Sequence, residues 1–361
     1  MKILFLSHKT IWRGVSVWML RVSHYLRDAG HEIHILAHPG NPLWERDVEG
    51  LHVKPLTIRF DFDPRAVLYV SRYIQSHQID VLIVNNPREI QIGGLAGLAI
   101  GVPVIRRIGR QDDFRDRWKD RFYHRKLILH SITTCDYIAR DIEQEMDYVK
   151  AGAIEHIANF RDPIEMEASR RAAIRHEWGV AHDELLLGTM VALEKEKGIL
   201  QILEALASVR DELPPWHYII CGDGSLKATI SESVRRLNLS DRVTMVGRVQ
   251  DSVEKSACFD IALIYSSMEG ISHTLLEYFA SGRPTISTDS GGLAEVVSHE
   301  HNALVVKWSD QEALERAIVR MSTDASLRSE LGQQARRDLQ DRFSTAVICK
   351  EWESWLQSCI T

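Results

Sequence analysis

The sequence predicts an α/β protein with two doubly wound, Rossmann-like domains. Strand-like and helix-like segments alternate along the chain, which is typical of parallel sheets covered by helices. The alternation is interrupted near residues 159–163, and 361 residues with 45% apolar and 26% charged side chains suffice for two separate cores. Because open α/β sheets bind ligands beyond the carboxyl ends of their strands, we expect the functional residues in loops after strands, facing a cleft between the domains.

In the first half, short apolar runs predict strands, and amphipathic segments with start and stop signals predict helices. One helix is expected over 15–28, ended by Gly30, and another over 64–77. The expected strands are 3–6, 32–37, 81–84, 102–105, and two near 130–134 and 154–157. The segment 159–163 reads as a linker, so the first domain is expected over residues 1–162.

The alternation resumes after the linker, and purely helical periodicity follows from residue 309 to the end. The expected strands are 185–193, 217–221, 243–246, 261–264 and 284–287. We expect a second domain over 163–340. A last helix over 341–361, which contains Trp352 and Trp355, is expected to pack back on the first domain.

The location of the protein is predicted from its first residues and its cysteines. The apolar run after Met1 is short and ends at Ser7, so it is typical of a buried strand and not of a signal peptide. No apolar stretch is long enough to span a bilayer. The five cysteines are scattered without CxxC spacing, which favours a reducing compartment. We therefore expect a cytoplasmic protein.

The segment 106–126 is unusually basic for a chain with a net charge of −6, since it holds nine basic and four acidic residues with four interleaved aromatic side chains. Such a stretch is either a solvated helix with local charge pairs or a surface for an anionic acceptor or membrane leaflet. The second interpretation predicts peripheral contact with the inner face of a membrane. No nucleic-acid partner is expected.

The stretch 269–277, Glu-Gly-Ile-Ser-His-Thr-Leu-Leu-Glu, is the most informative about function. Two carboxylates flank a turn and the first turn of an apolar helix, and Ser272 can cap that helix. The free amides of His273, Thr274 and Leu275 favour a phosphate, because they carry the positive end of the helix dipole. Carboxylates nearby can accept hydrogen bonds from hydroxyl groups. The pattern therefore suits a sugar linked to a phosphate.

This stretch resembles the Glu-x7-Glu signature of the retaining glycosyltransferases of the GT-B fold, the family 4 group. The resemblance implies a GT-B fold and a nucleotide-sugar donor, UDP- or GDP-linked, without a further cofactor. It implies that Glu269 faces hydroxyls of the donor sugar, that Glu277 holds the ribose, and that six of the residues between them line the donor. Those residues are Gly270, Ile271, Ser272, His273, Thr274 and Leu275. A solvated glutamate at each end of a helix is the alternative that this spacing alone would favour.

Two further turns carry the resemblance. Gly222-Asp223-Gly224 after an expected strand is similar to the Gly-x-Gly turn of the family, and Arg248-Val249 to the segment that meets the nucleotide base. The first turn also partly matches a dinucleotide-binding fingerprint, but Lys227 replaces the third glycine of that pattern. A tight turn that needs glycine dihedrals explains both segments equally well.

The resemblance also places Lys197 on the donor diphosphate, with Gly14 near the phosphates at the start of the first helix. Ala192 stands where the family usually has an arginine, which removes one positive charge from the expected site. Lys195 or Arg248 are candidates to replace that charge. The loss of one such donor typically costs a few kcal/mol of transition-state stabilisation.

The His-Asp that the family often has falls on Gly109 and Arg110 here. Acceptor contacts are therefore expected from Arg110, Asp112 and Asp113. Asp112 is the candidate for taking the acceptor proton, and a surface loop with paired charges is the alternative. Asp61-Phe62-Asp63 spells a metal-binding motif of another glycosyltransferase fold, but Asp63 before Pro64 is explained as a helix cap. The sixteen histidines show no known ligand spacing, so we expect no metal.

The sequence therefore predicts a metal-independent retaining glycosyltransferase of the hexosyltransferase type, with Glu269, Lys197 and Asp112 as catalytic candidates. Its expected acceptor is a saccharide or a lipid-linked saccharide, as in the assembly of cell-surface polysaccharide or lipopolysaccharide. Two alternatives stay open: a nucleotide-sugar 2-epimerase, and a non-catalytic protein that binds a nucleotide sugar.

Overall fold

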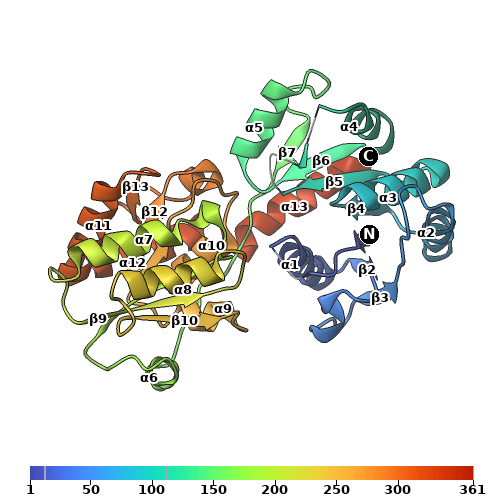
Figure 1. Cartoon of the computed structure of the whole chain (residues 1–361). Coiled ribbons are helices and arrows are strands. Elements are labelled where there is room, and N and C mark those ends of the chain that lie inside the picture. The colour runs from blue at the N-terminus through green and yellow to red at the C-terminus, as the bar shows by residue number, and fades with distance from the viewer. Residues whose placement is uncertain (12–13, 110–112, 115, 361) are drawn as a thin grey trace. The chain divides into compact units, whose positions relative to one another are not determined.

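The computed structural model describes residues 1–11, 14–109, 113–114 and 116–360. The chain divides into two compact units (Figure 1). The N-terminal unit comprises Met1–Ala158 together with the chain from Ile348 onward, and the C-terminal unit comprises Asn159–Val347.

Within its described residues, the N-terminal unit has a seven-stranded parallel sheet in the order β3-β2-β1-β4-β5-β6-β7. The strands are β1 (Lys2–Ser7), β2 (Glu32–Ala37), β3 (His52–Pro55), β4 (Val81–Val84), β5 (Val104–Ile108), β6 (His130–Thr133) and β7 (Ile154–His156). The helical segments are α1 (Gly14–Asp28), η1 (Pro42–Glu45), α2 (Pro64–His77), α3 (Pro87–Ile100), α4 (Trp118–Phe122), η3 (Tyr123–Leu127) and α5 (Asp136–Glu145).

The boundaries of α2 follow from its cap, as the sequence predicts. Asp63 is the N-cap residue, and its carboxylate accepts hydrogen bonds from the amides of Arg65 (3.0 Å) and Ala66 (3.4 Å). Pro64 occupies the first helical position, where no amide hydrogen is needed. The carboxylate of Asp63 therefore caps α2, as the sequence-based explanation of the Asp61-Phe62-Asp63 motif expects.

The last helix, α13 (Thr345–Ile360), joins the core of the N-terminal unit through its tryptophans. Trp352 is fully buried, and its ring centroid lies 5.9 Å from that of Trp18 on α1. Trp355 packs edge-on against His130 of β6, at 6.2 Å. Burial of a large aromatic side chain removes on the order of 150–250 Å² from water, so these contacts tie the chain end firmly to this unit.

Within its described residues, the C-terminal unit has a six-stranded parallel sheet in the order β10-β9-β8-β11-β12-β13. The strands are β8 (Leu185–Met190), β9 (Trp216–Cys221), β10 (Val243–Gly247), β11 (Ile261–Ile264), β12 (Thr285–Thr288) and β13 (Leu304–Val306). The helical segments are α6 (Ala168–Glu177), η4 (Lys195–Lys197), α7 (Ile199–Val209), α8 (Lys227–Arg236), α9 (Ser252–Ser256), α10 (His273–Ala280), η5 (Gly291–Glu295), α11 (Gln311–Thr323) and α12 (Ala325–Arg342). No helix in the described ranges is long and apolar enough to cross a bilayer.

The prediction of two Rossmann-like parallel-sheet domains is confirmed, but individual strands differ from their expected positions. β5 begins at Val104 and continues through Arg106 and Arg107, beyond the expected end at residue 105. Two consecutive arginines favoured an end of the strand at this point. Both are nevertheless buried, 1% and 6% exposed, and their guanidinium groups lie over Phe114 and Trp18. The short edge strands β3 and β13 were not expected.

Candidate functional site

The predicted donor residues of the C-terminal unit lie in loops that follow the carboxyl ends of β8, β9, β10 and β11. In a parallel sheet these ends lie along the same edge, so loops far apart in sequence become neighbours. Two backbone contacts join the loops after β8 and β11: the amide of Ser267 donates to the carbonyl of Glu196 (2.9 Å), and Gly198 lies so close to Tyr265 that a Cβ would sit 2.4 Å from its carbonyl oxygen. The left-handed φ of +60° at Gly198 also favours glycine.

Glu269 and Lys197 meet through this loop contact. The Lys197 ammonium group forms an ion pair with Oε1 of Glu269, and the two side chains are only 15% and 19% exposed. The Ser266 hydroxyl also lies 3.5 Å from Glu269 Oε1. The backbone of Glu269 is fixed separately, because its carbonyl accepts the amide of Gly292 (2.8 Å) in the η5 turn. Two of the predicted donor residues, a cation and a carboxylate, thus lie in direct contact, a pairing that the sequence did not predict.

Glu277 lies on α10 and is 4% exposed. The Ser252 hydroxyl of α9 donates to Glu277 Oε2 (2.9 Å), and the guanidinium group of Arg161 lies 3.8 Å from Oε1. Glu277 is therefore a buried carboxylate with polar neighbours, and the alternative of a solvated glutamate at this end of the helix is wrong. At the other end, Glu269 is also largely buried.

The position of α10 is set by its contacts with the end of β8. The Tyr278 hydroxyl accepts the amide of Met190 (2.9 Å), and the Thr274 hydroxyl donates to the Met190 carbonyl (3.1 Å). Burial raises the pKa of Tyr278, so its hydroxyl stays protonated. These contacts fix the start of α10 beside the loop that leads to Lys197.

Ser272 occupies the N-cap position of α10, but its side chain makes no capping hydrogen bond among the described residues. The first helical hydrogen bond runs from the amide of Leu276 to the carbonyl of Ser272 (3.2 Å). The amides of His273, Thr274 and Leu275 precede it, so they belong to the turn whose N–H groups point out of a helix. The expectation of a serine side-chain cap was wrong, whereas the helix starts where it was predicted.

The glycines after β9 have a structural requirement. Gly222 has a φ of +146°, and a Cβ there would sit 1.9 Å from the carbonyl oxygen of Val191. A Cβ on Gly224 would sit 2.6 Å from the carbonyl oxygen of Leu193. The amide of Leu193 in turn donates to the carbonyl of Asp223 (3.1 Å). The tight-turn explanation is therefore sufficient for both glycines, and it places them against the loop that carries Lys197.

Arg248 and Val249 line a hollow of about 490 Å³ on the C-terminal unit. Its wall includes Trp178 and Lys255, whose ammonium group lies 5.4 Å from the centroid of the Trp178 ring and 3.0 Å from Glu177. The hollow is thus lined by charges of both signs around one aromatic face. Ala192 is exposed after the end of β8, and Lys195 is exposed as well.

The predicted residues of the N-terminal unit are only partly described. Arg110 and Asp112 lie outside the described residues. The carboxylate of Asp113 accepts the amide of Gly109 (2.8 Å), and its carbonyl accepts a hydrogen bond from Arg106. Gly14 begins α1, and a Cβ there would meet no atom within 4 Å.

Sequence reasoning missed two residues near α10. Asn159 and Arg161 belong to the expected linker, but Asn159 is buried and its amide donates to the carbonyl of Ile271 (2.5 Å). Arg161 approaches Glu277, as described above. One indication of their role was present in the sequence: the expected linker carries an amide and a cation on either side of the apolar Phe160, which is unusual for a solvated linker.

Comparisons with known proteins bear on the family and the fold of the chain. Residues 170–338 match the family model described as Glycosyl transferases group 1, and residues 12–164 match Glycosyltransferase Family 4. The chain is 26% identical over 353 residues to the lipopolysaccharide core biosynthesis glycosyltransferase LpsE of Rhizobium meliloti, which covers 96% of each chain. It is 26% identical over 201 residues to N-acetyl-alpha-D-glucosaminyl L-malate synthase of Bacillus anthracis, or 56% of this chain and 52% of that one. This match spans about half the length of that relative.

Solved structures share the whole fold. The structure of HepE from Anabaena in complex with UDP has a TM-score of 0.84 at 19% identity, covering 99% of this chain and 100% of that one. A glycosyltransferase from Rickettsia africae has a TM-score of 0.88 at 16% identity, covering 100% of this chain and 98% of that one. With one glycosyltransferase model matched in each half and the architecture of these structures throughout, the chain belongs to the GT-B glycosyltransferases.

Proposed function

We propose that the protein is a retaining glycosyltransferase that moves a sugar from a nucleotide diphosphate sugar, UDP- or GDP-linked, to an acceptor hydroxyl. The Lys197–Glu269 ion pair beside the start of α10 carries this proposal. It places a cation, helix N-terminal amides and a carboxylate in adjoining loops of one unit. Those groups suit a diphosphate and a sugar that bind side by side.

In the proposed reaction, the bond between the sugar and the diphosphate breaks, and negative charge grows on the leaving phosphate. Lys197 and the amides of the first turn of α10 stabilise that charge, and no metal is needed for this step. Glu269 orients hydroxyls of the donor sugar and stabilises its cationic centre. The acceptor hydroxyl attacks from the face that the diphosphate leaves, so the anomeric configuration is retained.

Glu277 is proposed to accept hydrogen bonds from the ribose hydroxyls. Its carboxylate already accepts the Ser252 hydroxyl, which supports a role as an acceptor of hydroxyl hydrogens. Arg248 and Val249 are proposed to border the nucleotide base, and Gly224 to pass close to the donor, in the hollow and turn described above. Gly14 is proposed to serve the phosphates, and Arg110, Asp112 and Asp113 the acceptor, with Asp112 taking its proton.

The proposed acceptor is a saccharide or lipid-linked saccharide of a cell-surface polysaccharide or lipopolysaccharide. The name of LpsE, which aligns with almost the whole chain, supports this class. The exposed residues that follow the predicted acceptor residues in the sequence support an acceptor that is bound to a membrane. Trp118 (72% exposed), Phe122 (40%) and Leu129 (62%) lie among the exposed basic residues Arg117, Arg125 and Lys126.

Donor turnover followed by NMR tests the proposal. UDP-, GDP-, TDP- and ADP-sugars are offered without metal, and both nucleotide release and the anomeric configuration of each product are read. Release from one donor with a retained anomer is expected, and an inverted product would overturn the retaining mechanism. Binding without release would instead favour a non-catalytic nucleotide-sugar-binding protein, for which Ala192 is the specific observation. Conversion of a UDP-sugar without acceptor would favour the epimerase.

A further inference from the structure

Three side chains with metal-binding atoms lie together at the edge of the N-terminal sheet, and none of them is proposed to contact the donor. Glu32 and His34 are two positions apart on β2, so they point to the same face of the sheet. His52 on the edge strand β3 is the register partner of His34. Strand pairing therefore brings the three side chains to one face.

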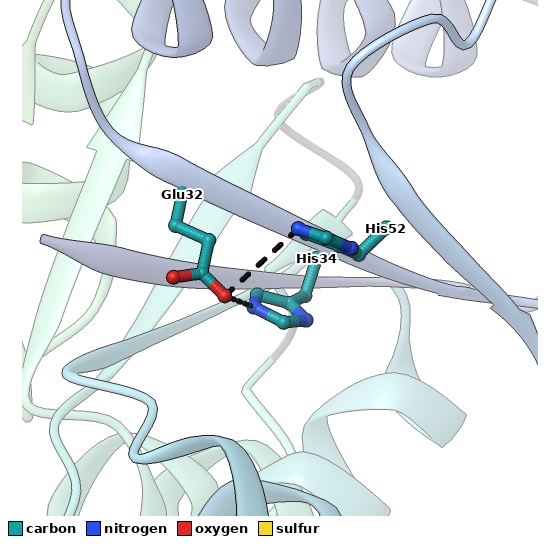
Figure 2. A group of neighbouring side chains, drawn as sticks. All are labelled: Glu32, His34 and His52. Carbon is teal, nitrogen blue, oxygen red and sulfur yellow. Dashed lines mark hydrogen bonds and ion pairs between the residues drawn. The ribbon is translucent and has the colours of Figure 1, made fainter.

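The geometry of this cluster is close to that of a zinc site. His34 Nε2 lies 2.9 Å and His52 Nε2 lies 3.9 Å from the same oxygen of Glu32, and the three ligand atoms all lie within 4.8 Å of one another. Figure 2 shows both imidazole rings turned toward this carboxylate. Metal–ligand distances of about 2.0–2.2 Å in a tetrahedral zinc site put neighbouring ligand atoms roughly 3.3–3.5 Å apart. Glu32 and His52 are exposed, so their side chains are free to rotate toward that spacing around the buried His34.

A second contact orients the buried ligand. His34 is 1% exposed, and its Nδ1 lies 2.9 Å from the Tyr73 hydroxyl of α2. As the structure stands, Nε2–H donates to the Glu32 carboxylate (2.9 Å), and Nδ1 accepts from the Tyr73 hydroxyl. When an ion takes the place of that hydrogen, the ring hydrogen moves to Nδ1 and is directed to the Tyr73 oxygen, and the Nε2 lone pair faces the ion. Histidine ligands of metals are commonly held through their other nitrogen in this way.

The opposite side of the cluster is open. The side chains of His52 and Glu32 are 58% and 40% exposed, which leaves access for an ion and for water as a further ligand. Lys2 competes for Glu32, but its ammonium group lies 3.6 Å from the other oxygen, Oε2, and is 35% exposed. It can therefore turn toward solvent when a cation arrives.

We propose that Glu32, His34 and His52 bind a Zn²⁺ ion, with water as the fourth ligand. The two imidazoles and one carboxylate are the ligand types that zinc takes in three-ligand sites. The ion would link the edge strand β3 to β2 and so stabilise this edge of the sheet. This site departs from the sequence-based expectation of no metal. The ligands do not share a helix motif, and only the β2–β3 register brings His52 to the other two.

Zinc titration of the full chain tests the site. After removal of metal with a chelator, isothermal titration with ZnCl₂ should give one equivalent bound by the wild-type protein. His52→Ala removes an exposed ligand, and Glu32→Gln removes the charge at almost constant size, so each should weaken binding at least about tenfold. His182→Ala, which removes an exposed histidine of the other unit, is the matched control and should bind as the wild type does. Far-UV circular dichroism confirms that all variants are folded.

Cobalt gives an independent readout. Co²⁺ in place of Zn²⁺ should produce visible absorption bands typical of tetrahedral coordination in the wild type and the His182→Ala variant, but not in His52→Ala. Absence of a bound equivalent in the wild type would overturn the proposal. Equal affinity in the wild type and His52→Ala would overturn it as well, because the ion would then lie elsewhere.

Discussion

The ammonium group of Lys197 and the carboxylate of Glu269 form an ion pair although they are 72 positions apart in the chain. Their loops are fastened to each other through the backbone of Ser267 and Glu196. The pair is therefore formed by the chain alone, and in the proposed reaction little rearrangement would be needed to present this cation to the diphosphate. Such preorganisation is the main way in which an enzyme stabilises charge that develops during a reaction.

Lys197→Ala should lower the turnover of the preferred nucleotide sugar by about 10²–10³-fold, because it removes one preorganised charge donor. Arg316→Ala is the control, since it removes a cation on α11 that is 68% exposed, pairs with Glu312 and has no role in the proposed site. Nucleotide release at saturating donor is the measurement. Activity of Lys197→Ala within threefold of the wild type would remove this residue from the proposed mechanism.

Glu277→Gln should weaken the binding of UDP or GDP, because a carboxylate that accepts ribose hydroxyls is replaced by a weaker neutral acceptor. A comparison with the 2′,3′-dideoxy nucleotide isolates the ribose contact. The dideoxy form should bind the wild type and Glu277→Gln with similar affinity, whereas the ordinary nucleotide should distinguish them by about tenfold, as expected for a charged hydrogen bond of about 1.5–3 kcal/mol. Isothermal titration provides both affinities. If the loss is equal for both nucleotides, Glu277 acts through the position of α10 and not through the ribose.

Much of the C-terminal site was predictable because it is encoded in continuous stretches. Glu269 and the start of α10 share one segment, and Lys197 follows a strand whose apolar pattern is clear. Ser252 and Arg161 were not predictable, because their approach to Glu277 depends on how separate segments pack around α10. Local patterns carry no information about such contacts.

In the N-terminal sheet, too, local patterns did not predict every element. Most of β5 was missed, because charged residues are rarely buried and the apolar pattern ends before Arg106 and Arg107. The Glu32–His34–His52 cluster could not be predicted from the sequence for another reason. Its ligands come from two strands, and the register between strands is not contained in either one.

Gly222→Ala should destabilise the protein by about 2–4 kcal/mol, because a Cβ 1.9 Å from the Val191 carbonyl forces the β8 and β9 loops apart. The φ of +146° adds strain for any residue with a side chain. Gly14→Ala is the control: it has open space around the new Cβ and should change stability by less than about 0.5 kcal/mol. Urea unfolding followed by circular dichroism measures both. A Gly222→Ala protein as stable as the wild type would show that the two loops do not pack as described.

Stability near neutral pH should depend on buried histidines, and His217 on β9 provides the test. It is 7% exposed, and its Nε2 lies 2.8 Å from the Thr244 hydroxyl. Burial is the main cause that lowers its pKa below 6.5. Between the lowered folded value and 6.5, the unfolded chain binds more protons than the folded chain. The contribution of His217 to stability is therefore fully present above pH 6.5 and is lost as the pH falls through the folded pKa.

The urea midpoint of the wild type should accordingly fall more steeply between pH 7 and pH 5 than that of His217→Gln, which cannot gain a proton in this range. The measurement is the difference between the two proteins in how steeply the midpoint changes with pH. Buried carboxyls such as Glu89, whose pKa is raised by burial, stabilise the folded chain as the pH falls. They do so equally in both proteins, so the difference isolates His217. Equal slopes would mean that His217 binds protons equally in the folded and unfolded chains. That result would contradict a neutral, buried imidazole held against Thr244, whatever the absolute stability of the variant.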